Sequence, residues 1–305
     1  MSRRLYDAHN HFQDERFGGR QAELISACAH EGIVCMVVNG SGEADWPQVI
    51  ALAKQFPLTQ PLVTLSPSGG EGRVRGQRAT GEHIVRGVSL PQILPSFGYH
   101  PWYVHERTPA WEQSLVRFLE QVPSAVGEIG LDRWKPDLSY EGQEEVFITQ
   151  LQLAAERNLP VSIHCLQTWG RMLEILKTEP RPARGFLLHS YGGPKEMVKP
   201  FADLGAYFSL PGYYAHERKL RQRETFNHVP PDRLLIETDA PDQSLPAERN
   251  RFPLIEPTTG RELNHPANLQ AIYEFAAELL GEAPDALAAR VEANFLRLFS
   301  GLACT

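Results

Sequence analysis

Six side chains of the kinds that bind divalent metals stand at the ends of short apolar runs in this chain of 305 residues. Imidazole nitrogens and carboxylate oxygens are common metal ligands in proteins. The six residues are His9, His11, Glu128, His164, His189 and Asp239. Each run is typical of a buried strand, and the ends of parallel strands meet at one face of a barrel. The sequence therefore predicts a metal centre assembled from distant parts of the chain.

The first two of these ligands, His9 and His11, are two residues apart. Residues i and i+2 of a strand point to the same side, so both rings can reach one metal while Asn10 faces away. An isolated pair of this kind is a weak signal. It gains weight because four further ligands end apolar runs in the same chain.

Six protein ligands would leave a single metal with no open position, so two metals fit the set better. We assign His9, His11 and Asp239 to one metal and His164 and His189 to the other, with Glu128 as the bridge. Two metals about 4 Å apart can clamp a phosphoryl group and activate a water. Asp239 and Glu128 are the predicted catalytic residues, and Asp239 would accept the proton of that water. Taken alone, Asp239 before Ala240-Pro241 could also be a helix N-cap.

The elements that must position these ligands alternate between strand-like and helix-like runs. The predicted strands are 5–11, 33–38, 93–98, 125–128, 161–164, 186–189, 206–210 and 234–239. The predicted helices are 21–28, 45–56, 111–121, 140–157, 169–177, 216–226, 267–280 and 284–299. Eight such alternations predict an α/β fold, a single-domain (β/α)8 TIM barrel over residues 1–305.

Two segments interrupt this alternation. Residues 66–90 are rich in Ser, Gly and Arg and show no periodicity, which predicts an inserted loop. The loop is either a clamp for a phosphate backbone or a solvated insertion. The second segment, residues 242–265, is long and rich in proline, and we expect it to rim the mouth of the barrel.

Composition narrows the function classes. The net charge of −7 argues against a protein that coats nucleic acid, although a nuclease with a local basic groove remains open. The four cysteines form no CxxC pair, which favours reduced thiols in the cytoplasm. No apolar run approaches the roughly 18 residues of a membrane span. We expect a cytoplasmic monomer that does not bind membranes.

Several motifs resemble the TatD family of metal-dependent deoxyribonucleases, within the amidohydrolase superfamily. Residues 7–11 (DAHNH) resemble the family's D-x-H-x-H motif, and residues 127–132 (GEIGLD) match its GEIGLD motif in full. Residues 188–193 (LHSYGG) and 237–241 (ETDAP) resemble its HCFSG and ETDSP segments. The resemblance covers nearly the whole chain. It implies a TIM barrel, dependence on divalent metals and hydrolysis of DNA phosphodiesters, often from the 3′ end. From the ligand types, the two ions are expected to be Mg2+, Mn2+ or Zn2+.

The residues expected to contact substrate follow the family pattern only in part. Leu166 stands where the family usually has an Arg, which removes one phosphate contact. His100, in GYHP, is predicted to point at substrate, or else to be a structural histidine at a strand end. After the GEIGLD motif, Arg133 or Lys135 could hold a phosphate and Trp134 could stack on a base, or the three form an exposed loop without such a role. Tyr191 is the third predicted substrate contact.

The sequence is compatible with three functions. The first is a metal-dependent nuclease that cleaves DNA, with single-stranded 3′ ends as its substrate. The second is a small-molecule hydrolase of the same superfamily that cleaves a lactone, amide or phosphoester. The third is a non-catalytic interaction protein, which the complete set of ligands disfavours. Lactonase-like and amidase-like members often have a carbamylated Lys as the bridge, so Glu128 favours the nuclease.

Overall fold

The computed structural model describes residues 3–58, 84–85, 88–135 and 138–302. Eight parallel strands form one sheet in the order β1-β2-β5-β6-β7-β8-β9-β10. Their bounds are β1 Leu5–Asn10, β2 Ile33–Asn39, β5 Gln92–Phe97, β6 Ala125–Asp132, β7 Val161–Leu166, β8 Phe186–Leu188, β9 Ala206–Pro211 and β10 Leu234–Glu237. Beyond the end of β10, the N–H of Asp239 donates to His9 O (3.0 Å) and the N–H of His11 donates to Ala240 O (2.7 Å). The sheet thereby closes, and the predicted barrel is confirmed.

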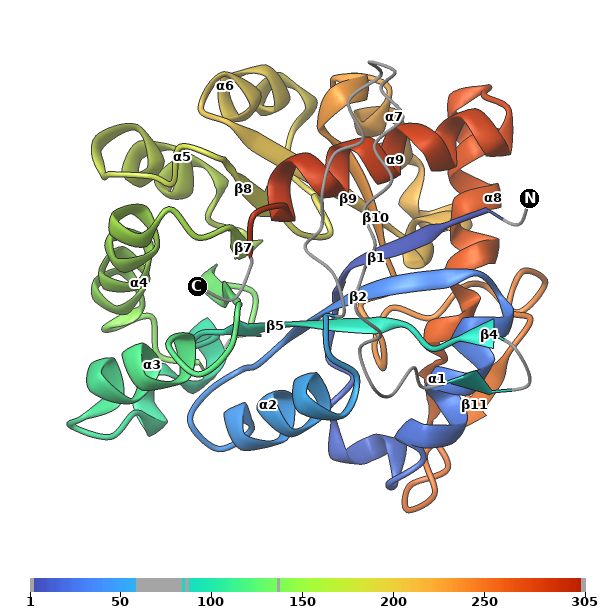
Figure 1. The fold of residues 1–305 in the computed structure, drawn as a ribbon. Helices are drawn as coiled ribbons and strands as arrows, with labels where there is room; N and C mark the ends of the chain where they lie inside the picture. Colours follow the sequence, from blue (N-terminus) through green and yellow to red (C-terminus); the bar gives the residue numbers. More distant parts are fainter. Residues whose placement is uncertain (1–2, 59–83, 86–87, 136–137, 303–305) are drawn as a thin grey trace, which may run out of the picture.

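Helices alternate with these strands and surround the sheet (Figure 1). In the described part of the chain they are α1 Gln21–His30, α2 Trp46–Gln55, α3 Trp111–Leu119, α4 Gln143–Arg157, α5 Trp169–Thr178, α6 Val198–Asp203, α7 Leu220–Phe226, α8 Leu269–Leu280 and α9 Pro284–Phe299. The eight helices expected from periodicity all occur. The additional one, α6, is a six-residue helix whose buried residues are Val198 and Phe201, too short to show a helical period.

Five predicted strand ends near the site were wrong. The strand predicted at 5–11 ends at Asn10, and the strand predicted at 161–164 runs on to Leu166, so His164 lies inside β7. The strand predicted at 125–128 runs on to Asp132, so Glu128 lies inside β6 and not at its end. The strand predicted at 186–189 ends at Leu188. The strand predicted at 234–239 ends at Glu237, because Asp239 has a left-handed φ of 52° that breaks the extended backbone.

The two segments that interrupt the predicted alternation differ in how much of them the structure describes. Most of the predicted insertion at 66–90 lies outside the described residues; within it, β3 (Ile84–Val85) pairs antiparallel with β4 (Val88–Ser89). The segment 242–265 contains a second short antiparallel pair, β11 (Pro253–Ile255) and β12 (Glu262–Asn264). The N–H of Asn264 donates to Pro241 O (2.8 Å), so this hairpin is attached beside the end of β10.

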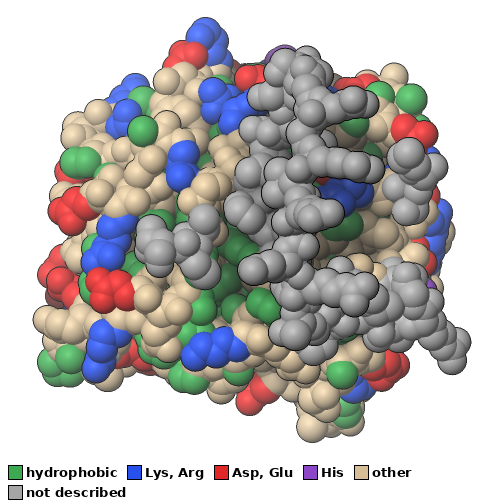
Figure 2. Space-filling view, viewed as in Figure 1, with side chains coloured by type: hydrophobic (Ala, Val, Ile, Leu, Met, Phe, Trp, Pro, Cys, Tyr) green, Lys and Arg blue, Asp and Glu red, His purple; other side chains and the backbone are tan. Residues whose placement is uncertain are grey.

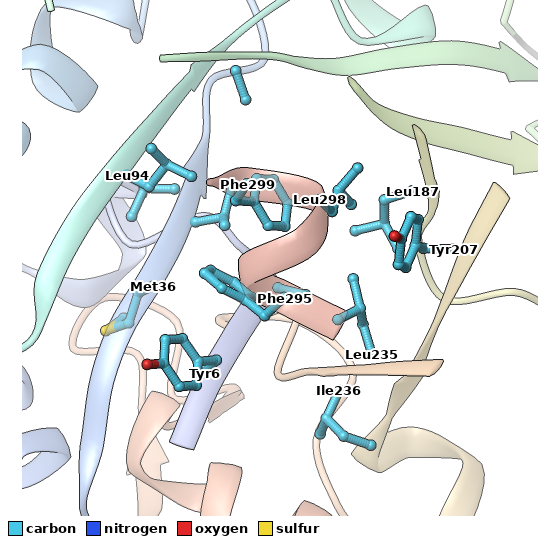
Figure 3. Close-up of a cluster of buried hydrophobic side chains, with 14 of the residues drawn as sticks. Tyr6, Met36, Leu94, Leu187, Tyr207, Leu235, Ile236, Phe295, Leu298 and Phe299 are labelled. Carbon is cyan, nitrogen blue, oxygen red and sulfur yellow. The ribbon is translucent and has the colours of Figure 1, made fainter. Parts of the chain in front are cut away.

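The C-terminal helix α9 packs against β1 and β10. Figure 3 shows Phe295, Leu298 and Phe299 of α9 among side chains of the barrel strands, which include Tyr6, Met36, Leu94, Leu187, Tyr207 and Leu235. The rings of Phe295 and Tyr6 are 4.7 Å apart between centroids, and both side chains are fully buried. Tyr6, Leu187, Tyr207 and Leu235 each stand second in their strands. Helix α9 therefore covers the N-terminal end of the barrel, opposite the end where strand-terminal residues gather.

The surface charges, the cysteines and the helices do not point to a particular function. Figure 2 shows acidic and basic side chains interspersed over the described part of the face that it presents. Cys28, Cys35 and Cys165 are buried free thiols. Among the described residues, no helix is both long enough and apolar enough to cross a membrane.

Candidate metal centre

Glu128 is the centre of a cluster of imidazoles at the C-terminal end of the barrel. Its side chain is buried, and each carboxylate oxygen faces a different group of rings. Oε2 lies 3.2 Å from Nε2 of His9 and 3.1 Å from Nε2 of His11. Oε1 lies 2.8 Å from Nδ1 of His164 and 2.8 Å from Nε2 of His189. One carboxylate therefore stands between two pairs of histidines.

Asp239 joins the first of these groups. Its Oδ1 lies 3.7 Å from Nε2 of both His9 and His11. Its Oδ2 accepts a hydrogen bond from the side-chain amide of Gln243 (2.5 Å). The left-handed backbone at Asp239 turns the carboxylate back over the end of β10, which explains how a residue beyond the strand reaches the centre.

Neighbouring acceptors fix the orientation of two of the rings. Nδ1 of His11 donates to the carbonyl oxygen of Asn39 (2.8 Å), and Nε2 of His164 donates to Oδ2 of Asp132 (2.8 Å). Each ring in its neutral form then has its lone pair on the other nitrogen, which faces Glu128. Such partners behind the ring are the usual companions of histidine ligands.

This arrangement fits a bound cation. Lone pairs directed at a carboxylate repel it unless a proton or a metal lies between them. Nε2 of His9 is buried and makes no hydrogen bond to any described residue. Buried polar atoms are rarely left without a partner, so this nitrogen is suited to hold a metal. The sets His9–His11–Asp239 and His9–Glu128–His189 each bring three candidate ligand atoms within 4.8 Å of one another.

The pKa values of these side chains in the absence of a cation also favour a bound metal. Burial lowers the pKa of His9 to about 4, and the charge of His189 adds to the effect. Burial also acts to lower the pKa of His11, but the hydrogen bond and charge of Glu128 outweigh it and raise that pKa to about 9. Burial raises the pKa of Asp239 to about 7, against the opposing charges of His189 and His11. Protons alone would leave the rings in unlike charge states, whereas metal ions would engage them all as neutral ligands.

His100, predicted to contact substrate, also faces Glu128. Its Nε2 lies 3.3 Å from Oε1 of Glu128, and its ring is 4.4 Å from that of His164 between centroids. Its Nδ1 accepts the backbone N–H of Trp102 (3.1 Å), so the neutral ring carries its proton on Nε2. His100 thus presents a donor to the centre, whereas His11 and His164 in their neutral forms present acceptors.

The two remaining predicted substrate contacts lie elsewhere. Tyr191 is fully buried, and its hydroxyl donates to Pro194 O (2.9 Å). Its ring packs against Trp169 and Phe208, so this structure gives Tyr191 a packing role. The exposed Arg133 lies over the ring of Tyr140, 3.9 Å from its centroid. Neither residue is joined to Glu128 by a contact among the described residues.

Sequence reasoning missed two buried carboxylates behind the centre. Asp132 accepts hydrogen bonds from His164, from the indole N–H of Trp102 (2.7 Å) and from the N–H of Trp134 (2.6 Å). Glu237 lies 3.7 Å from Nδ1 of His189 and accepts the hydroxyls of two serines. Each stands an even number of residues from a predicted ligand, Glu128 and Asp239 respectively. The period of two along β6 could have indicated Asp132.

A barrel that brings four imidazoles and two carboxylates together at the C-terminal side of its strands belongs to the class of (β/α)8-barrel enzymes with a carboxylate–imidazole centre. Comparison with known proteins narrows this class. The family model described as "TatD related DNase" matches residues 6–300. The chain therefore belongs to the TatD-related DNase family, and it is a hydrolase that acts on ester bonds.

Two relatives carry the same description. A "3'-5' ssDNA/RNA exonuclease TatD" of Escherichia fergusonii is 34% identical and covers 97% of this chain and 98% of its own length. The protein so described from Salmonella typhimurium is 36% identical over 74% of this chain and 88% of its own length. A solved TatD homologue from Escherichia coli K12 has a TM-score of 0.77 at 24% identity, covering 98% and 99% of the two chains. That structure supports the fold.

Proposed function

We propose that this protein is a metal-dependent exonuclease that removes nucleotides from the 3′ ends of single-stranded DNA. The observation that carries the proposal is the position of Glu128, one oxygen toward His9 and His11 and the other toward His164 and His189. This geometry supports two divalent metals with Glu128 as the bridge. The descriptions of the relatives support a nucleic-acid strand as the substrate.

The residues that would hold the metals are the six predicted from the sequence. His9, His11 and Asp239 would bind one ion, His164 and His189 the other, and Glu128 both. Bound there, two divalent ions would neutralise the scissile phosphate and lower the pKa of water to near 7. Mg2+, Mn2+ and Zn2+ are the candidate ions, since mixed imidazole and carboxylate sites accommodate each of them.

Two side chains would move or hold protons. Asp239 would accept the proton of the attacking water, because its Oδ1 points at the centre while Gln243 holds its Oδ2. His100 would donate from Nε2 to a phosphate oxygen, because Trp102 fixes its proton on that nitrogen. In this role His100 binds substrate, and the other four histidines bind the metals.

A direct assay tests the proposal. A single-stranded oligonucleotide labelled at its 5′ end is incubated with Mg2+, Mn2+, Zn2+ or EDTA, beside duplex DNA and single-stranded RNA. We expect a ladder of products shortened from the 3′ end that EDTA abolishes. Intact oligonucleotides together with cleavage of small esters or lactones would replace the nuclease by a small-molecule hydrolase. Faster cleavage of RNA than of DNA would change the substrate but keep the metal centre.

A second experiment separates the role of His100 from that of a metal ligand. His100→Gln keeps a donor and His100→Ala removes it. We expect both variants to bind the same number of metal ions as the unchanged protein, while His100→Ala loses far more turnover than His100→Gln. A loss of one bound ion in His100→Ala would show that the ring is a ligand.

A further inference from the structure

The ammonium group of Lys135 is held over an aromatic ring beside the metal centre. Its Nζ lies 3.9 Å from the centroid of the Trp102 ring, and the side chain is exposed. No ion pair joins Lys135 to a carboxylate among the described residues. A cation on an aromatic face is attracted by the ring's quadrupole and keeps its N–H groups available on the other side.

Trp102 is itself fixed against the centre by three contacts. Its indole N–H donates to Asp132, and its backbone N–H donates to His100. Its ring lies 6.2 Å from that of His164 between centroids, edge to face. The Trp102 ring therefore lies between the Lys135 ammonium and the cluster around Glu128, and Lys135 is at the rim of the site.

The neighbouring cation, Arg133, is directed elsewhere. Its guanidinium lies on the ring of Tyr140, whose hydroxyl donates to Glu144 (2.9 Å) on helix α4. Glu144 also accepts hydrogen bonds from Arg171 (2.7 Å) on α5. Arg133 thus belongs to a polar cluster on the outer helices. Of the two cations that the sequence offered for a phosphate, the structure favours Lys135.

We infer that Lys135, supported by Trp102, is a subsite for a backbone phosphate of the bound strand, next to the phosphate that is cleaved. This inference rests on the proposed nuclease function. A phosphate needs a donor of opposite charge, and an ammonium already held in place loses less conformational entropy on binding than one that moves freely. Because the Trp102 ring separates Lys135 from Glu128, the scissile group stays with the metals and Lys135 binds the adjoining phosphate. The subsite favours strands over mononucleotide esters.

Binding of an uncleaved strand provides the test. The full chain is titrated into a fluorescent oligothymidylate with phosphorothioate linkages, with and without EDTA, and anisotropy is followed over a series of salt concentrations. We expect Lys135→Ala to raise Kd about tenfold, the scale of one charge-assisted contact. The slope of log K against log salt should fall by about 0.7, the change for one phosphate on a single strand. Lys135→Arg should restore most of the affinity.

Two variants provide the comparison. Lys199→Ala removes an exposed lysine whose ammonium pairs with Asp203 on α6, and we expect it to bind as the unchanged protein does. Arg133→Ala tests the other cation of the loop. An unchanged Kd in Lys135→Ala, or an equal loss in Lys199→Ala or in Arg133→Ala, would overturn the subsite.

Turnover gives an independent measurement. Lys135→Ala should raise KM for an oligonucleotide with kcat nearly unchanged, and leave both constants for a p-nitrophenyl nucleotide ester as they are. If the unchanged protein cleaves oligonucleotides and Lys135→Ala has the same KM, the subsite alone is wrong. If the unchanged protein neither binds nor cleaves oligonucleotides, the nuclease function fails and the subsite fails with it.

Discussion

Oδ2 of Asp132 accepts a hydrogen bond from Nε2 of His164 at 2.8 Å, and this contact decides which nitrogen of the ring faces Glu128. Burial raises the pKa of Asp132, but the hydrogen bond and charge of His164 outweigh it and hold the pKa below its ordinary value. The carboxylate therefore stays ionised behind the ring. It connects the centre to Trp102, and through Trp102 to the rim of the site.

Asp132→Asn should weaken metal binding without unfolding the protein. The amide would be a poorer acceptor for the ring N–H, and loss of such a partner behind a ligand typically costs about 10- to 100-fold in metal affinity. Titration calorimetry with Mn2+ measures this directly. Asp203→Asn, which removes an exposed carboxylate from α6, is the control and should bind Mn2+ normally. Unchanged affinity in Asp132→Asn would contradict the positioning role.

Glu128→Gln and Asp239→Asn should each lower turnover by roughly a thousandfold or more, the combined scale of metal and general-base effects. Glu128→Gln removes the charge shared by both groups of rings, so its metal content should fall as well. Asp239→Asn keeps the ligand oxygen and loses the proton acceptor. Glu120→Gln, a change at an exposed carboxylate, serves as the control. Near-native rates in either variant would exclude the assigned role.

The fold could be predicted because each strand of the barrel corresponds to a short apolar run in the sequence, and each long helix shows apolar residues with a period of 3.6. The exact ends of the strands could not. Asp239 appeared to end a strand because the apolar run leads into it, yet its left-handed φ of 52° ends β10 two residues earlier. Nothing in the local composition shows that backbone turn, which depends on contacts with β1.

The sequence predicted the candidate metal ligands well, but it predicted the residues around them less well. His9 and Glu128 meet because parallel strands bring their C-terminal halves together. Tyr191 and Arg133 were chosen from motifs, which give no orientation, and the structure directs one into the core and the other onto Tyr140. Trp102 was not predicted, because its role depends on the hydrogen bond from its indole N–H to Asp132, at the end of β6 and distant in the sequence.

Phe295→Ala should destabilise the barrel strongly and leave the centre intact. The ring is fully buried beneath the strands and packs on Tyr6 and Phe299, so its removal leaves a cavity at the closed end. Such truncations cost about 3–5 kcal/mol. Urea unfolding measures the loss. Leu220→Ala, at a side chain that is 60% exposed, should change the free energy of unfolding by less than about 0.5 kcal/mol. A Phe295→Ala loss as small as that would contradict the packing described for α9.

His265 gives a pH dependence at a residue that is not one of the candidate metal ligands. Its Nδ1 accepts the N–H of Ala267 (3.0 Å), and burial, with the charge of Arg20, lowers its pKa to about 4. The unfolded chain, with a histidine pKa near 6.5, binds this proton more readily than the folded protein. The neutral ring therefore contributes stability above pH 6.5 that is lost progressively as the pH falls toward 4.

His265→Gln keeps an acceptor at this helix start but removes the titrating group. The free energy of unfolding should fall less between pH 7 and pH 5 in this variant than in the unchanged protein. Urea unfolding at the two pH values measures both slopes. His105→Gln, at an exposed histidine, should keep the full pH dependence. If His265→Gln loses as much stability on acidification as the unchanged protein, the buried neutral ring is not the source of the effect.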